Sequence, residues 1–507
     1  MFEESKVNPE DVASVTIGTT HFINAVVEGD QARLAKVAVV RLCGPFSKGV
    51  PPGIDWPVRL RNLICAYHCR VDGGLEVDGE LISEIDESQI RQQAEIIKSK
   101  GIKSVVINGI FSPVDVVYRQ EESAAAIFKE CYPEADIVIS KDVANLGFLE
   151  RENAAILNAS ILPFARKTIA SFQSAISRLG LKCPVFITQN DGTILLASNA
   201  SKLPIRTFSS GPTNSMRGAA FLTQNDIKEA MMVVDIGGTT TDVGLLLANG
   251  FPRQAAAFSE ISGVRTNFSY PDVRSIGLGG GSIVRRREDG MMSIGPDSVG
   301  YQLPQKAMVF GGDIATATDY TVLGGGCEIG DRSLVADKLE GHDDFKAVVK
   351  QMLERVIDTM KTSAEDIPVL LVGGGAVIAP DELKGASKVV KPEWSGVANA
   401  IGAATARVSG IIDTIQSTES KTSKQVMEEI SKTAIQKAID NGAKAETVQV
   451  VEMDHLPLQV SFRDQRRSSL TDPSILRINQ DLSSKPWETS TLIRNFLPRN
   501  TLYLQIT

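Results

Sequence analysis

VVDIGGTTTDVGLL, residues 233–246, is the stretch of sequence that decides the fold. A hydrophobic run ends at Asp235, two glycines and three threonines follow, and a second hydrophobic run begins after Asp242. This order predicts a strand, a tight turn and a second strand, which is a β-hairpin that bends at Gly237 and Gly238. An ordinary glycine hairpin has the same outline, but it does not need an aspartate at each end.

The chemistry of this hairpin favours a phosphate. Glycine lets backbone N–H groups approach an anion closely because no Cβ intervenes, and Thr239, Thr240 and Thr241 add hydroxyl donors. Two carboxylates beside a phosphate need a hard cation, so we expect Asp235 and Asp242 to hold Mg²⁺. The structural alternative for Asp242 is a carboxylate that only stabilises the turn. The sequence contains no GxxxxGK[ST] segment and therefore no P-loop.

Composition places the chain among globular proteins of two or more domains. It has 507 residues, with 43% hydrophobic and 22% charged residues. The net charge of −8 disfavours a general nucleic-acid-binding role, and no apolar stretch reaches membrane-spanning length. The first residues lack a signal-peptide core, and the six cysteines form no CxxC pair. We expect a cytoplasmic protein without nucleic-acid or membrane partners.

Predicted strands alternate with predicted helices, which is typical of an α/β sheet layered with helices. Residues 86–100 predict a helix capped by Asp86 or Ser88, and residues 367–375 predict a buried strand that stops at three glycines. The glycine cluster at 277–282 follows a segment in which we recognise no clean strand. The polar tail after about residue 460 is expected to pack poorly or to be disordered.

Three glycine-rich turns, at 235–242, 277–282 and 373–375, fit one nucleotide cleft, because ligands of α/β sheets bind at strand ends. A glycine hairpin followed later by a strand, GGG and a helix is the arrangement of the actin-like and sugar-kinase-like ATPases. Further segments extend the match. They are IGTTHFINAVVE (17–28), RVDGGLEVDGE (70–80), FSSGPTNSMRGA (208–219), TATDYTVLG (316–324) and ANAIGAA (398–404). Together these motifs resemble the hydantoinase A / 5-oxoprolinase family over roughly residues 5–455.

The resemblance implies a two-lobed, actin-like (ribonuclease H-like) ATPase fold. Residues 1–200 would form the first lobe, residues 201–410 the second lobe with the phosphate hairpin, and residues 411–507 a divergent C-terminal region. Family members usually carry a DxGGTxTD hairpin of their own before the IGTT segment, and we find no counterpart here. We therefore expect a first lobe truncated at its start, and weak or no ATPase activity.

The resemblance also implies roles for individual residues. Asp235 and Asp242 would be catalytic and metal-binding, and Thr19, Thr20 and Asn24 would lie at the substrate or cleft side. The implied nucleotide-binding residues are Gly237, Gly238, Thr239, Thr240, Thr241, Gly279, Gly280, Gly281, Ser282, Gly373, Gly374 and Gly375. Helix capping is the alternative for Thr19 and Thr20, and for Asp319 we favour a cap or a turn over catalysis.

Members of this family use ATP to open cyclic amides such as hydantoins and 5-oxoproline through a phosphorylated carbonyl. The resemblance therefore implies ATP and Mg²⁺ as cofactors. It also implies either a hydantoinase B-like partner subunit or a homo-oligomer. One alternative is an ATP-dependent subunit like those of ketone carboxylases, and another is a non-catalytic homologue with an incomplete phosphate clamp.

Overall fold

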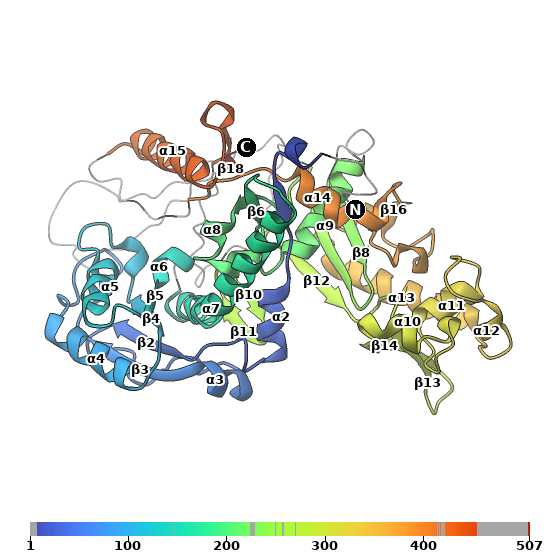
Figure 1. Ribbon diagram of the computed structural model, residues 1–507, viewed down its shortest axis with the longest axis horizontal. Coiled ribbons are helices and arrows are strands. Elements are labelled where there is room, and N and C mark those ends of the chain that lie inside the picture. The colour runs from blue at the N-terminus through green and yellow to red at the C-terminus, as the bar shows by residue number, and fades with distance from the viewer. Residues whose placement is uncertain are drawn as a thin grey trace.

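The computed structural model describes residues 8–145, 147–223, 229–248, 250–255, 258–268, 270–412, 414, 416, 421–453 and 505–506. Nearly all of the tail that we expect to pack poorly therefore lies outside the described residues. We call the elements up to α8 the first lobe and those from α9 to α14 the second lobe, and the two stand side by side (Figure 1).

The first lobe contains two sheets. Four parallel strands have the order β3-β2-β4-β5, and a smaller sheet has the order β1-β6-β7. The strands are β1 (Val15–Ile17), β2 (Val37–Leu42), β3 (Cys65–Val71), β4 (Ser104–Gly109), β5 (Asp136–Ile139), β6 (Val185–Thr188) and β7 (Ile194–Leu196). The helices are α2 (His21–Glu28), α3 (Val58–Ile64), α4 (Glu87–Ser99), α5 (Gln120–Cys131), α6 (Ser140–Val143), α7 (Phe148–Arg178) and α8 (Ala197–Ala200).

The second lobe is built on a five-stranded sheet with the order β12-β9-β8-β15-β16. Its strands and two further hairpins are β8 (Met231–Ile236), β9 (Thr241–Leu246), β10 (Ser259–Ile261), β11 (Val264–Thr266), β12 (Val273–Ile276), β13 (Ser282–Arg286), β14 (Met292–Ser298), β15 (Ile367–Val372) and β16 (Ala386–Val390). The helices are α9 (Ser210–Thr223), α10 (Leu303–Lys306), α11 (Ala317–Leu323), α12 (Ser333–Ala336), α13 (His342–Met360) and α14 (Ala398–Thr405).

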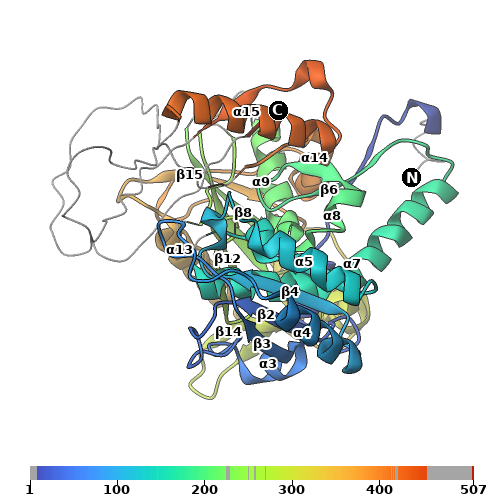
Figure 2. The same ribbon diagram turned by 90° about the vertical axis from the view of Figure 1, so that its left-hand side faces the viewer.

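After the second lobe the chain returns to the first. Helix α15 (Ser423–Asp440) lies at the top of the molecule in both views (Figure 1 and Figure 2). The backbone N–H of Leu196 donates to the carbonyl of Asn441 at 3.1 Å, which ties the end of α15 to β7. The short strands β17 (Val450–Glu452) and β18 (Gln505–Ile506) follow.

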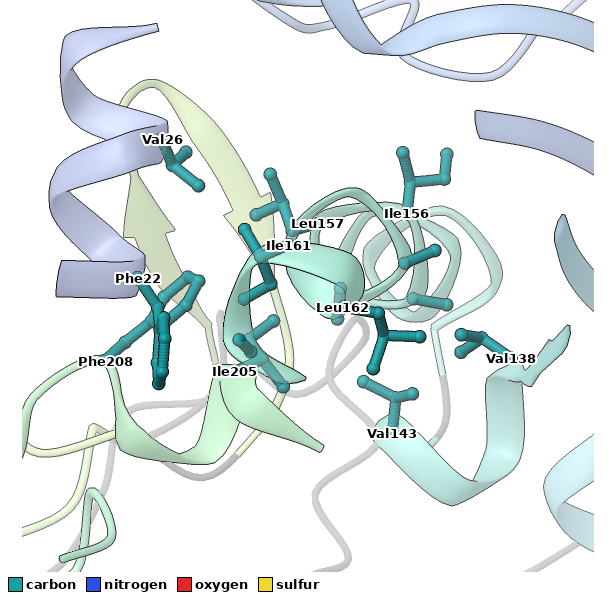
Figure 3. Close-up of a cluster of buried hydrophobic side chains, with 14 of the residues drawn as sticks. Phe22, Val26, Val138, Val143, Ile156, Leu157, Ile161, Leu162, Ile205 and Phe208 are labelled. Carbon is teal, nitrogen blue, oxygen red and sulfur yellow. The ribbon is translucent and has the colours of Figure 1, made fainter. Parts of the chain in front are cut away.

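The core of the first lobe surrounds α7. Phe22 of α2 and Phe208 lie on one side of this helix, and Val138 and Val143 lie on the other (Figure 3). The β10–β11 hairpin also joins this core through buried side chains such as Val264. The connection between β9 and β12 therefore reaches from the second lobe into the first.

Helices α9 and α13 cover opposite faces of the five-stranded sheet. Met216 of α9 packs with Val233 on one face, and Leu353 of α13 packs with Val234 on the other. Alternate residues of β8 point to opposite faces, which explains why neighbouring valines enter different cores. Among the described residues, we find no helix with the length and apolar character needed to cross a bilayer.

The structure tests two of the local predictions. The predicted helix at 86–100 is confirmed as α4, and the Asp86 side chain accepts hydrogen bonds from the N–H groups of Ser88 and Gln89. The statement that no clean strand precedes the glycine cluster at 277–282 is wrong, because β12 lies there. This strand is at the edge of its sheet and exposes Arg274 and Ser275, so its sequence shows no hydrophobic run.

Candidate functional site

The phosphate candidate is a hairpin, as predicted. Strands β8 and β9 pair in antiparallel register, with Asp235 opposite Asp242. The N–H of Gly237 donates to the carbonyl of Thr240 at 2.9 Å and closes the turn. Residues 238–240 at the tip are exposed to solvent.

The second glycine turn is hydrogen-bonded to this hairpin. The N–H groups of Gly280 and Gly281 donate to the carbonyls of Gly237 and Gly238 at 3.1 and 2.7 Å. Ser282 holds the turn from inside, because its hydroxyl accepts the N–H of Gly279 at 2.8 Å. The first and second predicted turns therefore form one continuous backbone surface.

Thr241 and Gly279 fix the distance between these two turns. The Thr241 hydroxyl is buried and donates to the carbonyl of Leu278 at 2.6 Å. A Cβ at Gly279 would lie 2.6 Å from the backbone nitrogen of Thr239, so only glycine allows the approach. Thr241 thus faces the second turn, whereas Thr239 and Thr240 face solvent.

The third glycine turn meets the hairpin from the opposite side. Val372 of β15 pairs with Asp235 in parallel register, and the chain then turns at Gly373 with φ +86°. The N–H of Gly375 donates to the carbonyl of Ile236 at 2.8 Å. A Cβ at Gly373 would lie 2.3 Å from Oδ1 of Asp235. The three glycine turns predicted from the sequence thus come together around the end of β8.

The two carboxylates sit in an environment that disfavours their charged forms. Burial raises the pKa of Asp242 to about 6, and the charge of Asp235 adds to this increase, while the Ser275 hydroxyl on Asp242 opposes it. Burial also raises the pKa of Asp235, against a hydrogen bond from Ser215. The two half-buried carboxylates face each other, and no positively charged side chain of the described residues lowers the pKa of either one.

This donor set fits a hard divalent cation. Mg²⁺ is usually held by one or two carboxylates, with substrate phosphates and water completing its coordination. Within the described part of the chain, no group of three or more His, Cys, Asp or Glu side chains could hold a metal. A cation between Asp235 and Asp242 would therefore depend on a phosphate ligand, as in many nucleotide sites.

Sequence reasoning missed three polar residues of this site. Ser215 on α9 is hydrogen-bonded to Asp235, and Ser275 on β12 is hydrogen-bonded to Asp242. The Tyr270 hydroxyl is hydrogen-bonded to Ser209, and burial and the charge of Asp242 raise the pKa of Tyr270. Ser275 pairs with Asp242 in the sheet register, so recognising β12 as a strand would have found it. Nothing local to the sequence indicates Ser215 or Tyr270.

Of the predicted cleft residues of the first lobe, Thr19 is hydrogen-bonded to α9 of the second lobe. Thr19 is buried; its N–H donates to the hydroxyl of Ser210 at 3.0 Å, and that hydroxyl donates to its carbonyl at 2.9 Å. The Thr19 hydroxyl also accepts the N–H of His21 at 3.2 Å, which is a cap-like contact at the start of α2. Thr20 is the N-cap residue without a side-chain capping bond, and Asn24 is exposed on α2.

Asp319 caps a helix, which is the structural role that the sequence analysis favours over catalysis. Its carboxylate accepts the N–H and the hydroxyl of Thr316, both at 2.7 Å, which completes a capping box at the start of α11. The same carboxylate accepts the N–H of Val309 at 2.7 Å. All of these contacts are buried and none involves the hairpin.

The fold and the three converging turns define a two-lobed α/β protein with the actin-like ATPase fold. Two solved structures share this fold. The ATP-dependent caprolactamase from Pseudomonas jessenii gives a TM-score of 0.70 at 17% identity, covering 100% of this chain and 80% of that chain. Nucleotide-free acetone carboxylase gives a TM-score of 0.64 at 19% identity, covering 94% of this chain and 74% of that chain.

The chain belongs to the hydantoinase/oxoprolinase family. The family model "Hydantoinase/oxoprolinase" matches residues 151–369, and the model "Hydantoinase/oxoprolinase N-terminal region" matches residues 1–132. The acetophenone carboxylase gamma subunit of Aromatoleum aromaticum is 25% identical over 275 residues, which are 53% of this chain and 36% of that protein. The chain spans half or less of the length of the curated relatives that it matches.

Proposed function

We propose that this chain binds ATP with Mg²⁺ at the β8–β9 hairpin and uses it to activate the carbonyl of a cyclic amide for hydrolysis. One observation carries the proposal: Asp235 and Asp242 face each other at the base of an exposed glycine turn that both other glycine turns contact. Such a geometry suits the phosphates and the cation of a nucleotide.

Each part of the site has a defined task in this proposal. Thr239 and Thr240 are exposed, and their N–H groups and hydroxyls bind the phosphates. Asp235 and Asp242 hold the cation, which supplies charge neutralisation during phosphoryl transfer. Gly374 is exposed, and a Cβ added there would meet no atom within 4 Å, so this turn has room for the nucleoside.

The chemistry explains why ATP is needed. An amide carbonyl is a weak electrophile, and phosphorylation of its oxygen, with ADP as the leaving group, makes the carbon attackable. Water then adds to this carbon and the C–N bond breaks, with a proton moving to the nitrogen. A second water releases phosphate from the acyl phosphate and leaves a carboxylate. The hairpin contributes only to the phosphorylation step, in which it positions the phosphates and neutralises their charge.

The family and the fold shared with an ATP-dependent caprolactamase support a cyclic amide as the substrate class in this proposal. Ketone activation for carboxylation is the second candidate, because one relative is named as a subunit of acetophenone carboxylase. Both reactions begin with a carbonyl group and use the same hairpin. In either case we propose a partner subunit of the hydantoinase B type, since that relative is itself a subunit.

The test is ATP hydrolysis by the purified chain with hydantoin, 5-oxoproline and caprolactam, and in parallel with acetophenone or acetone plus bicarbonate. We expect a cyclic amide to stimulate phosphate release weakly and without bicarbonate. Stimulation only by a ketone together with bicarbonate would replace the proposal by the carboxylase candidate. Saturable Mg-ATP binding without turnover on any substrate, with or without a co-purified partner, would identify a non-catalytic homologue.

A further inference from the structure

Trp394 is largely exposed to solvent. It lies in the loop that connects β16 to α14 and is 67% exposed, whereas Trp56, the other tryptophan among the described residues, is 4% exposed. Single apolar side chains are common on protein surfaces, so exposure alone indicates no function. What distinguishes Trp394 is the conformation of its backbone and the place where its loop is attached.

The backbone of Trp394 is left-handed. Its φ is +66° and its ψ is +13°, a conformation that is unfavourable for a bulky side chain. Two hydrogen bonds hold the loop in this shape: the N–H of Ser395 donates to the carbonyl of Pro392 at 3.1 Å, and the N–H of Val397 donates to the carbonyl of Trp394 at 3.0 Å. Strained residues of this kind are concentrated at binding and active sites, where the surrounding structure fixes them.

The loop is attached to the third glycine turn. The carbonyl of Ser395, the residue after Trp394, accepts the N–H of Gly373 at 3.0 Å. Gly373 itself lies against Asp235, since a Cβ added to it would be 2.3 Å from Oδ1 of that carboxylate. One residue and one hydrogen bond thus separate Trp394 from the turn that borders the proposed cation site.

A second contact ties the same segment to the site. The Asn399 side chain donates to the hydroxyl of Ser215 at 3.3 Å and to the carbonyl of Gly211 at 2.9 Å, both on α9. Ser215 is in turn hydrogen-bonded to Asp235. The segment from Trp394 to Asn399 is therefore held against the site at both ends, which keeps Trp394 beside the third turn.

We propose that the indole ring of Trp394 stacks on the base of the nucleotide whose phosphates bind at the β8–β9 hairpin, and that this contact makes the site prefer purine over pyrimidine nucleotides. The inference rests on the proposed function and names the residue that recognises the base. The polar groups of the hairpin serve the phosphates and the cation, so the base needs a surface of its own. Every base has a π-face on which an aromatic ring can stack, and that of a purine is larger than that of a pyrimidine.

Calorimetry with Mg-ATP, Mg-CTP and Mg-tripolyphosphate separates the base from the phosphates. We expect Trp394→Ala to weaken Mg-ATP about tenfold, which is typical of removing one aromatic ring from a stacked base. Mg-tripolyphosphate has no base, so its affinity should not change. The unchanged chain should bind Mg-ATP several-fold more tightly than Mg-CTP, and Trp394→Ala should remove most of this difference. If the ring only stabilised the loop, its removal would weaken all three probes alike.

The matched control is Phe46→Ala, because Phe46 is an aromatic residue that is 52% exposed in the loop after β2 of the first lobe. This variant should bind all three probes like the unchanged chain. Trp394→Phe keeps a ring that can stack, so its affinity for Mg-ATP should stay within about threefold of that of the unchanged chain. If Trp394→Ala does not fold, Trp394→Gly replaces it, since glycine adopts the left-handed φ without strain.

Indole fluorescence gives a second measurement. Mg-ATP should change the emission of the unchanged chain, because a stacked base alters the surroundings of the exposed ring. Trp394→Phe should lose this change, since it leaves only Trp56 and Trp487. Unaltered emission of the unchanged chain at saturating Mg-ATP contradicts the stacking.

A folded Trp394→Ala variant that binds Mg-ATP as tightly as the unchanged chain overturns the inference, and so does one that loses affinity for Mg-tripolyphosphate to the same extent. In both outcomes the unchanged chain still binds Mg-ATP, so the proposed function stands. Absence of saturable Mg-ATP binding by the unchanged chain would instead contradict the proposed function, and the inference would fall with it.

Discussion

Asp235 and Asp242 are direct cross-strand partners in the β8–β9 hairpin. Opposite residues in an antiparallel pair have Cβ atoms about 5 Å apart, and like charges at this distance destabilise a sheet. Ser215 and Ser275 relieve each carboxylate by one hydrogen bond, and neither brings a positive charge. The pair is thus unfavourable for the stability of the hairpin and suited to a cation.

Removing both carboxylates should therefore abolish Mg-dependent ATP affinity and leave the fold intact. For Asp235→Ala plus Asp242→Ala we expect a loss of about a hundredfold or more in affinity, measured by calorimetry with Mg-ATP, because charge-assisted contacts contribute most there. The control is Asp337→Ala plus Asp358→Ala, which removes two exposed carboxylates of the same lobe. Equal affinity in all three proteins would make the hairpin merely structural.

Gly373 and Gly374 offer a second test, because they are neighbours with opposite surroundings. A Cβ at Gly373 would lie 2.3 Å from Oδ1 of Asp235 and needs a φ of +86°, whereas a Cβ at Gly374 would meet no atom within 4 Å. Gly373→Ala should displace Asp235 and weaken Mg-ATP about tenfold or more, and Gly374→Ala should not. The same affinity for both variants in calorimetry would contradict this geometry.

The sequence predicts the hairpin and the convergence of the glycine turns because both depend on short, contiguous segments of sequence. Glycines after a hydrophobic run mark a strand end, and parallel neighbours such as β8 and β15 bring their ends to one edge of the sheet. The edge strand β12 is missed because its exposed Arg274 and Ser275 interrupt the apolar pattern.

The partners of the carboxylates could not be predicted in the same way. Ser215 reaches Asp235 only because α9 packs on one face of the sheet. Tyr270 lies in the connection between β9 and β12, which packs against the core of the first lobe. Such sites depend on tertiary packing, which leaves no periodic signal.

The raised pKa of Asp242 predicts how the stability of the metal-free protein changes with pH. The value is about 6 in the folded chain, against about 3.9 for an unfolded aspartate. Between these pH values the folded state binds more protons, so the free energy of unfolding falls as pH rises from about 4 to about 6. Because the side chain is only half-buried, we expect a change of about 1 kcal/mol.

Asp242→Asn isolates this contribution from those of other buried acids. Chemical denaturation of both proteins in EDTA should show their difference in stability growing in favour of the asparagine variant as pH rises through this window. A difference that stays constant across it would mean that Asp242 ionises normally. Mg-ATP should not be present, because a bound cation favours the charged form.

The contact between α9 and α14 allows a last prediction, about stability and its link to the site. A Cβ at Gly402 would lie 1.9 Å from the carbonyl oxygen of Asn214, so the two helices touch backbone to backbone. Gly402→Ala should force them apart and cost about 3 kcal/mol of unfolding free energy, measured by chemical denaturation. At Gly396, where a Cβ would meet no atom within 4 Å, the same substitution should cost nothing comparable.

The same displacement should reach the proposed nucleotide site. Asn399 on α14 donates to the hydroxyl of Ser215 at 3.3 Å, and Ser215 bonds Asp235. Gly402→Ala should therefore weaken Mg-ATP several-fold at temperatures where the variant is still folded, and Gly396→Ala should not. A destabilised Gly402→Ala variant with unchanged Mg-ATP affinity would show that the helix pair supports the fold without positioning Asp235.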